Sequence, residues 1–270
     1  MSTAEQVTDA RERLAAAVEQ MADSDTFAAW LRARAAFHDY SWGNLALIVS
    51  QRGDATQVAG YKTWLALGRQ VKKGERGIRI LAPCVRKLED KESGERVRRV
   101  VAFRTVSVFD VAQTEGEELP ALEYRPLVGE APDLADFLCG VAMAAGLEIR
   151  RETLTDGRHG YLSRAQRLIV VDSEQSGAMA AKVVCHELGH YFDPWLTENP
   201  DAYSAHRGDC EAVAESVAYV VAARFGLDAG PAAVAYVTSW INGDPSRVRD
   251  LAERIDHAAR AILGTDGGEP

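Results

Sequence analysis

Residues 183–192 read Val-Val-Cys-His-Glu-Leu-Gly-His-Tyr-Phe, and this stretch decides how the C-terminal half of the chain is interpreted. Side chains four positions apart on a helix lie one turn apart on the same face, so His186 and His190 can bind one metal ion. Imidazole nitrogen is a preferred ligand of zinc, at about 2.0–2.1 Å. The neighbouring apolar residues predict a buried helix, and they are Val183, Val184, Leu188 and Phe192. Burying a histidine without a partner costs free energy, so the two histidines are expected to have one.

Glu187 follows the first histidine and therefore lies beside the metal rather than on it. A carboxylate there is close enough to take a proton from water on the zinc, which is the task of a general base. A catalytic zinc also needs a third protein ligand and an open position for water. Glu211 is the candidate, because a distance of 21 residues from His190 allows a loop and a returning helix. Small residues would let the two helices approach closely: Gly189, Ala212 and Ala214.

Glu215 lies one helical turn beyond Glu211 on the same face. From there it is expected to accept a hydrogen bond from the free ring N–H of a ligand histidine. The sequence thus predicts one zinc ion per chain, with Glu187 as the catalytic residue and a set of three ligands: His186, His190 and Glu211.

Tyr203 and His206 lie in the segment before Glu211. Either residue is a candidate donor for stabilising an oxyanion in the peptide-cleavage reaction that such a zinc site supports. An ordinary loop role is favoured for both.

The remaining pattern of apolar residues predicts an α+β fold. The C-terminal part is expected to be mainly helical, with helices at 134–145, 175–192, 207–225, 231–241 and 245–263 and short strands at 147–151, 160–163 and 168–171. The N-terminal part is expected to form a small α+β unit, with short helices at 41–51 and 61–67 and a long strand pair or one bent strand over 97–109.

Charge is distributed unevenly along the chain. The whole protein has a net charge of −9, whereas residues 61–105 contain thirteen basic and five acidic side chains, a net charge of +8. A basic, strand-rich segment with interspersed aromatic residues is typical of proteins that follow the backbone of single-stranded nucleic acid. The residues expected to contact DNA are Trp42, Lys62, Trp64, Lys72, Lys73 and Arg76. The alternative is a solvated basic surface over core aromatics.

An acidic stretch with three prolines, 113–132, predicts a boundary between two domains. We expect a DNA-binding domain at 1–120, a linker at 121–132 and a metallopeptidase domain at 133–265. No apolar run is long enough to span a membrane and the N-terminus does not resemble a signal peptide, so a cytoplasmic protein is expected. The four cysteines form no CxxC pair and are expected to be free, mostly buried thiols.

Two families share these motifs. His186 to His190 followed by Glu211 resembles the gluzincin metallopeptidases, and the run Glu211-Ala212-Val213-Ala214-Glu215-Ser216-Val217-Ala218-Tyr219 resembles their ImmA/IrrE-like branch. The resemblance covers roughly 133–263. It implies a zincin-like fold in which the strand 168–171, before the metal helix, is the edge strand that lines the substrate cleft.

The N-terminal motifs resemble the single-stranded-DNA-binding domain of ArdC-type antirestriction proteins. They are Tyr40-Ser41-Trp42-Gly43-Asn44, Gly60-Tyr61-Lys62-Thr63-Trp64, Val71-Lys72-Lys73-Gly74-Glu75-Arg76-Gly77 and Val108-Phe109-Asp110-Val111-Ala112-Gln113-Thr114. The two halves together resemble an ArdC-like protein over nearly the whole chain. The loop between Phe192 and Glu211 differs from that of the best-known plasmid members, so the resemblance does not identify the substrate.

The function expected from the sequence is a zinc-dependent peptidase joined to a single-stranded-DNA-binding domain, of antirestriction type. Its protein substrate is expected to be DNA-associated, such as a restriction enzyme or a regulator, and no membrane partner is expected. Two alternatives remain: a DNA-binding antirestriction protein whose zinc site is structural or vestigial, and an ImmA-like regulator that cleaves a repressor. Glu187 disfavours a purely structural site, because a structural zinc needs no base.

Overall fold

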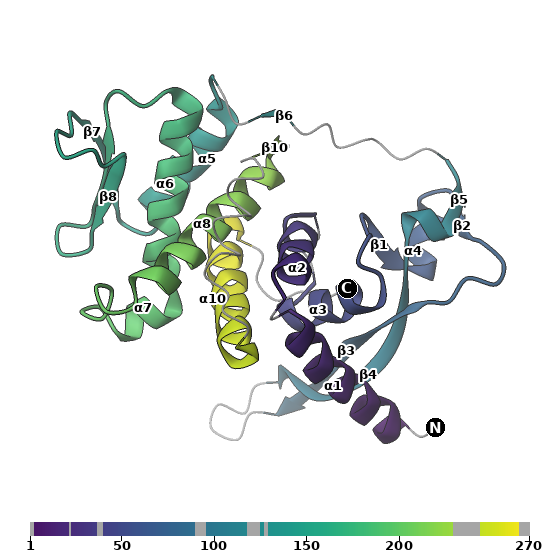
Figure 1. The fold of residues 1–270 in the computed structure, drawn as a ribbon. Helices are drawn as coiled ribbons and strands as arrows, with labels where there is room; N and C mark the ends of the chain where they lie inside the picture. Colours follow the sequence, from purple (N-terminus) through teal and green to yellow (C-terminus); the bar gives the residue numbers. More distant parts are fainter. Residues whose placement is uncertain are drawn as a thin grey trace.

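The computed structural model describes residues 3–21, 23–36, 40–89, 96–117, 125–126, 129–228 and 244–264. It confirms a mixed α+β fold, whose helices and short sheets are shown in Figure 1. Within these ranges no helix has both the length and the apolarity that a membrane crossing requires. The expected helix at 231–241 and the tip of the hairpin at 90–95 lie outside the described residues.

The N-terminal half places three helices against a small antiparallel sheet. Its order is β1-β4-β3, and a second pair, β2 and β5, lies beside it. The strand expected at 97–109 is one long strand, which pairs with β3 to form a two-stranded ribbon. The elements are α1 (Thr3–Gln20), α2 (Ser24–Ala36), α3 (Trp42–Gln51), β1 (Val58–Gly60), α4 (Tyr61–Ala66), β2 (Arg69–Val71), β3 (Ile78–Glu89), β4 (Arg96–Asp110), η1 (Val111–Gln113) and β5 (Thr114–Gly116).

Two amide side chains of α3 cover the outer edge of β3. Asn44 donates to the Leu81 carbonyl at 2.7 Å and accepts from the Leu81 N–H at 2.9 Å. Gln51 makes the same pair of bonds with Arg79, both at 2.9 Å. Unpaired strand edges are sites of unwanted association, so this helix protects the start of the ribbon while fixing its direction.

The C-terminal half consists of helices packed on a three-stranded sheet of order β7-β9-β8. Strand β9 is buried at all five positions and lies between parallel β7 and antiparallel β8. The elements are β6 (Arg125–Pro126), α5 (Pro132–Ala144), β7 (Glu148–Glu152), β8 (Gly160–Ser163), β9 (Leu168–Asp172), α6 (Gly177–Phe192), α7 (Pro194–Glu198), α8 (Arg207–Arg224), β10 (Leu227–Asp228) and α10 (Pro245–Leu263).

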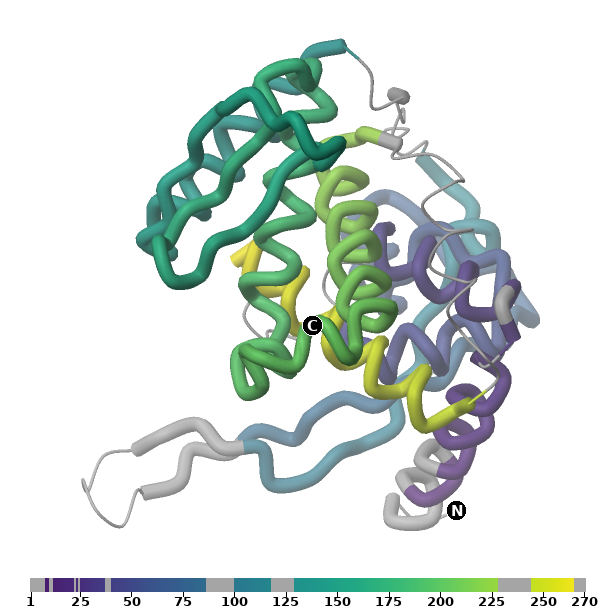
Figure 2. Tube along the Cα trace, turned by 60° about the vertical axis from the view of Figure 1, so that its left-hand side comes forward, coloured from purple at the N-terminus to yellow at the C-terminus, as the bar shows by residue number. Residues whose placement is uncertain are grey.

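One hydrophobic core continues from the N-terminal helices into the C-terminal half. Figures 1 and 2 show α10, in yellow, beside both α8 and the N-terminal helices. Arg34 of α2 pairs with Asp256 of α10 at 2.8 Å, and Arg260 donates to the Tyr40 carbonyl at 2.6 Å. The two halves of the sequence are therefore packed together, with polar contacts across the junction. Residues 121–124 and 127–128 of the expected linker lie outside the described residues.

The cysteines are unbridged, as expected, but their burial differs from the expectation. Cys185 and Cys210 are buried, whereas Cys84 is partly exposed and Cys139 is exposed. Cys139 lies on α5 away from the face that Leu134, Leu138 and Ala142 bury.

A buried ion pair fixes the end of α6 against α10. Asp193 follows α6 directly, and its carboxylate accepts from Arg254 at 3.0 and 2.6 Å, with side-chain exposures of 0% and 5%. Asp193 also caps α7 by accepting from the Trp195 N–H at 3.0 Å. Removing one member of a buried pair leaves the other charge uncompensated, which is strongly destabilising.

We expect Asp193→Ala to lower the free energy of unfolding by about 3–5 kcal/mol, because it leaves the Arg254 guanidinium buried without its carboxylate. Urea denaturation followed by circular dichroism measures this. Arg13→Gln is the control, since Arg13 forms a solvent-exposed pair with Asp9 and should change stability by less than about 1 kcal/mol. A similarly small loss of stability for both variants would contradict the assignment of Asp193 and Arg254 as a stabilising buried ion pair.

Candidate metal centre

Helices α6 and α8 approach each other closely at Gly189. A Cβ atom added there would lie 3.0 Å from the Ala214 Cα and 3.3 Å from the Val217 Cβ. Such contacts are tighter than nine in ten that real Cβ atoms make, so glycine allows the observed distance between the helices without a shift of its neighbours. Ala212 and Ala214 are fully buried at the same contact. The small residues predicted from the sequence to allow close packing therefore do so.

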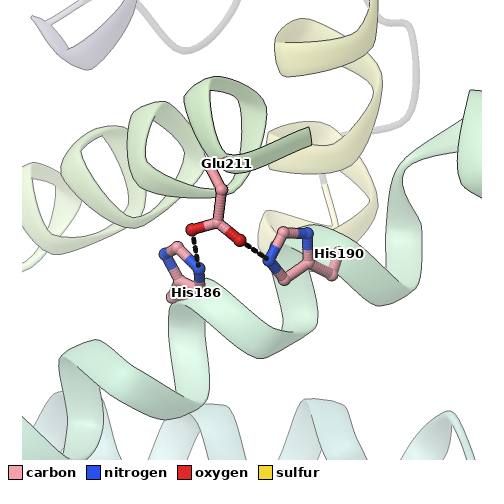
Figure 3. Close-up of side chains that lie close together, drawn as sticks. All are labelled: His186, His190 and Glu211. Atoms are coloured by element: carbon pink, nitrogen blue, oxygen red, sulfur yellow. Dashed lines mark ion pairs between the residues drawn. The ribbon is translucent and has the colours of Figure 1, made fainter. Parts of the chain in front are cut away.

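This packing brings the three predicted ligands together (Figure 3). Glu211 of α8 lies across from the two histidines of α6, with Oε2 at 3.5 Å from His186 Nε2 and Oε1 at 3.4 Å from His190 Nε2. The histidine rings are 4.7 Å apart and nearly perpendicular. One ligand atom from each of the three residues lies within 4.8 Å of the others.

The donor set fits a divalent cation. Ligand atoms bound tetrahedrally to zinc at about 2.0–2.1 Å are separated by about 3.3–3.4 Å. The observed nitrogen–oxygen separations of 3.4 and 3.5 Å match that spacing and are long for direct hydrogen bonds. Two imidazoles and one carboxylate are also a ligand set that zinc enzymes use while leaving a fourth position open.

Charges in the site interact strongly. Burial alone would lower the pKa of His186, but the Glu211 and Glu215 carboxylates beside its ring nitrogens raise it to about 9. Burial opposes ionisation of Glu211, yet the imidazoles of His186 and His190 and the Tyr203 hydroxyl hold its pKa well below the usual range. Glu211 is thus a carboxylate, the form that binds metal.

Glu215 lies where the sequence predicted it, on the far side of His186. Its Oε2 is 3.4 Å from His186 Nδ1, and its Oε1 accepts from Lys182 at 2.6 Å. A carboxylate on the second ring nitrogen orients the imidazole and increases its basicity toward a metal. Lys182, which sequence reasoning did not identify, holds that carboxylate in place from the preceding turn of α6.

Glu187 is 8% exposed and lies in the same cavity as the ligand triad. Burial raises its pKa above the ordinary value, against the opposing effect of His186 and His190, and the backbone N–H of Leu162 also hydrogen-bonds it. Its carboxylate is therefore adjacent to the metal ligands but contributes to none of the three ligand contacts, as its place in the sequence predicted.

The site opens into a cavity of about 780 Å³. One wall is β8, including Gly160, Tyr161 and Leu162. The expectation that strand 168–171 lines the cleft was wrong, because the corresponding strand, β9, is buried in the centre of the sheet and β8 occupies the edge. Strand order depends on pairing between distant segments, so the apolar run of β9 did not reveal it.

Tyr203 and His206 are placed differently. Tyr203 lines the cavity, donates its hydroxyl hydrogen to Glu211 Oε1, and packs edge-on against His190 at 5.5 Å. His206 instead packs against Trp195 at 4.9 Å and is not among the described residues that line the cavity. Of the two oxyanion candidates, only Tyr203 therefore lies at the site.

The predicted DNA-binding residues fall into two groups. Lys62, Lys72, Lys73 and Arg76 are exposed. Trp64 is not available as a stacking surface, because it is 2% exposed and donates to the Phe109 carbonyl at 2.8 Å. The expectation for Trp64 was therefore wrong, since its ring belongs to the core. Trp42 is partly buried against the core, with the Arg249 guanidinium 5.6 Å from its ring centre, and its role in DNA binding stays a prediction.

The basic turn at 72–76 is held by a motif that follows β4. The side-chain amide of Gln113 donates to Glu75 at 2.8 Å and to the Arg76 carbonyl at 2.9 Å. Asp110 accepts from the N–H groups of Thr56 and Gln57 at 2.8 and 3.1 Å. These bonds hold the turn and the segment before β1 against the end of β4, so Gln113 and Asp110 have a structural role.

Comparison with known proteins agrees with this organisation. Residues 2–109 match the family of N-terminal domains of the anti-restriction factor ArdC. A protein of Bacillus anthracis described as uncharacterized is 25% identical, over 86% of this chain and 46% of that protein. The chain thus spans less than half the length of that relative.

Two crystal structures of the antirestriction protein ArdC from the R388 plasmid share the fold, over 83% of this chain and 84% of theirs. The metal-free structure matches with a TM-score of 0.52 at 23% identity, and the Mn(II)-bound structure with 0.51 at 21%.

Fold and site together define an α+β protein with a candidate metal centre between two helices of its C-terminal half. Within that class the chain is similar to ArdC, since residues 2–109 match the family of ArdC N-terminal domains and the overall fold resembles that of R388 ArdC.

We expect His190→Ala to lose nearly all bound metal, because two ligands hold a divalent ion much more weakly than three. Elemental analysis after loading with zinc and dialysis measures the content per chain. His206→Ala is the matched control and should retain wild-type metal content. A full metal equivalent in His190→Ala would place the ion elsewhere.

Proposed function

We propose that the protein is a single-stranded-DNA-binding, zinc-dependent peptidase of antirestriction type that acts on DNA-associated proteins. The observation that carries this proposal is the convergence of His186, His190 and Glu211 in one cavity, with buried Glu187 beside them. The ArdC domain at residues 2–109 supports the DNA-binding and antirestriction parts.

His186, His190 and Glu211 would hold the cation, and Glu215 would orient His186. A bound divalent cation polarises a scissile carbonyl and makes water more acidic. Zinc suits a ligand set of two imidazoles and a carboxylate. The Mn(II)-bound structure of R388 ArdC supports a divalent cation at this site more generally.

Glu187 performs the proton transfers in this proposal. Its carboxylate accepts a proton from the attacking water and passes it to the departing amide nitrogen. Its burial in the cavity wall keeps bulk water from competing for that proton. A site that only stabilised the fold would have no use for a buried carboxylate in this position, and this favours catalysis over a structural metal.

The edge of β8 supplies a binding surface for an extended peptide. It lines the cavity on the side of Glu187, and its partner β9 pairs with only one of its edges. A free strand edge binds a peptide through main-chain hydrogen bonds with little dependence on sequence. Such a cleft has low specificity of its own, so selection of substrate would depend on the other half of the chain.

DNA binding provides that selection. The net charge of +8 over residues 61–105 attracts phosphate, whereas the acidic remainder does not. Binding to the same DNA strand raises the concentration of a DNA-bound protein near the cleft. Restriction enzymes and DNA-bound regulators are the substrates that fit this arrangement and the antirestriction name of the related ArdC.

We expect Glu187→Gln to retain metal and fold but to lose peptidase activity by at least about a hundredfold, because the amide cannot accept the proton from water. Cleavage of candidate DNA-bound proteins, followed by mass spectrometry of new termini, measures it. Activity within a few-fold of wild type would contradict the role of general base. A wild-type protein that cleaves nothing would favour the vestigial-site alternative.

We expect replacement of Lys72, Lys73 and Arg76 by alanine to weaken binding to single-stranded DNA of any sequence, and to reduce its dependence on salt, because fewer counterions are released. Fluorescence anisotropy with labelled oligonucleotides at several salt concentrations checks this. Trp64→Phe serves as a comparison, because replacing a core tryptophan should change the free energy of unfolding rather than the affinity for DNA. Unchanged affinity in the triple variant would mean that the turn is only a solvated surface.

A further inference from the structure

The cavity beside the metal centre is cationic away from the metal. Among the described residues that line it, the carboxylates are those of the metal site: Glu187, Glu211 and Glu215. The other charged lining residues are Arg158, Arg164, Lys182 and Arg207. The chain as a whole has a net charge of −9, so this lining departs from the average. A cleft lined by one sign of charge concentrates ligands of the opposite sign, and this part of the cavity therefore suits an anionic group.

Arg207 differs from the other cations of the cavity because its charge is not compensated. Arg158 forms an ion pair with Asp156 at 2.6 Å, and Lys182 holds a carboxylate of the metal site at 2.6 Å. Arg164 donates to two backbone carbonyls at the end of α6, at 2.6 and 3.1 Å. Arg207 is exposed and forms no ion pair or side-chain hydrogen bond with a residue that the structure describes. Its guanidinium is available to a ligand in the cavity.

Arg207 lies next to the metal centre. It begins α8 one helical turn before Glu211, so the two side chains lie on the same face of the helix. A rise of about 1.5 Å per residue separates them by about 6 Å along the helix axis. Tyr203, which donates to Glu211, is close to the same guanidinium: burial raises the pKa of the Tyr203 hydroxyl, and the charge of Arg207 opposes that rise. A group bound by Arg207 is therefore close to the metal.

The first position of α8 is unfavourable for a cation in the free protein, because the positive end of the helix dipole lies there. His206, the N-cap residue, makes no side-chain hydrogen bond to the first turn. The acidic residue of that turn, Asp209, is already paired with Arg247 at 2.9 Å. The positive potentials of the helix end and of the guanidinium therefore add, and an anion bound there would be stabilised by both.

We propose that Arg207 is a specificity residue, whose guanidinium binds a carboxylate of the peptide in the cleft. The carboxylate comes from an acidic side chain close to the scissile bond or from the C-terminus of the substrate. Guanidinium and carboxylate form paired, charge-assisted hydrogen bonds, which fix the position of the ligand as well as its charge. The inference rests on the proposed peptidase function and adds a side-chain preference to main-chain binding along β8.

The dimensions of an extended peptide agree with this role. Residues that point to the same side of a strand are about 6.6–6.8 Å apart. This spacing is close to the offset of about 6 Å between Arg207 and Glu211 along α8. With the scissile bond at the metal, a carboxylate within about two residues of that bond is therefore in reach of Arg207.

The test measures binding of short alanine–serine peptides to the zinc-loaded full chain, by fluorescence anisotropy with an uncharged label. The chain carries Glu187→Gln, so that bound peptides stay intact. Peptides with blocked ends differ at one central residue, which is glutamate, glutamine or lysine. A fourth peptide has the glutamine sequence with a free C-terminal carboxylate, and it separates the two sources of the anion.

A peptide with a carboxylate should bind about tenfold more tightly than the blocked glutamine peptide, as a charge-assisted hydrogen bond predicts. The glutamate peptide is the tighter ligand if Arg207 binds a side chain, and the free-acid peptide if it binds a chain end. Arg207→Gln should abolish the preference, and Arg207→Glu should make the lysine peptide the tightest ligand.

Arg224→Gln is the matched control, because it removes the same charge from an exposed position in the last turn of α8. It lies about 25 Å from Arg207 along the helix and, at a Debye length of about 8 Å, should leave every affinity within about twofold. Arg207→Gln should keep its zinc and unfold at the same or a higher temperature, since it removes a cation from the positive end of the helix.

The proposal is overturned if Arg207→Gln keeps the preference for a carboxylate, or if the parent chain binds the blocked glutamine peptide as tightly as both peptides with a carboxylate. Loss of zinc from Arg207→Gln would also overturn it, because the arginine would then act on the metal site. Failure of the parent chain to bind any of the peptides would instead contradict the proposed peptidase function, so the two failures are distinguishable.

Discussion

The close contact of α6 with α8 at Gly189 is the constraint on which the candidate site depends. Glu211 comes from a different helix than the histidines, and its carboxylate lies 3.4–3.5 Å from both Nε2 atoms where the two helices meet without a side chain at position 189. The same contact brings Glu215 to the second nitrogen of His186. A larger residue at position 189 would press on Ala214 and Val217 of α8, the helix that carries both carboxylates.

The helix α10 connects this site with the N-terminal half. Its Arg254 fixes Asp193 directly after the metal helix, and two residues further on Asp256 meets Arg34 of α2. Both contacts are buried, so each is costly to break. The N-terminal helices and the helix that carries the histidines are therefore attached to one element, α10, which favours a fixed orientation of the cleft relative to the N-terminal half.

Much of the site could be predicted from the sequence, because its geometry follows from helical periodicity. His186 and His190, one turn apart, and Glu211 and Glu215, one turn apart, needed only the assumption that two helices meet. What depends on contacts between distant segments could not be predicted. The edge position of β8, the burial of Trp64 under β4, and the core shared by α10 with the N-terminal helices all result from such pairings. The exposure of Phe103 on β4 depends on the same kind of pairing, since an alternating strand does not reveal which of its faces is covered.

The central claim is that these two helices build one metal centre, and anomalous diffraction from a crystal loaded with zinc tests it most directly. The account predicts a single anomalous peak within about 2.0–2.2 Å of His186 Nε2, His190 Nε2 and a carboxylate oxygen of Glu211, with Glu187 close by but unbound. A peak coordinated by other residues, or a well-ordered triad without a peak at saturating zinc, would contradict it.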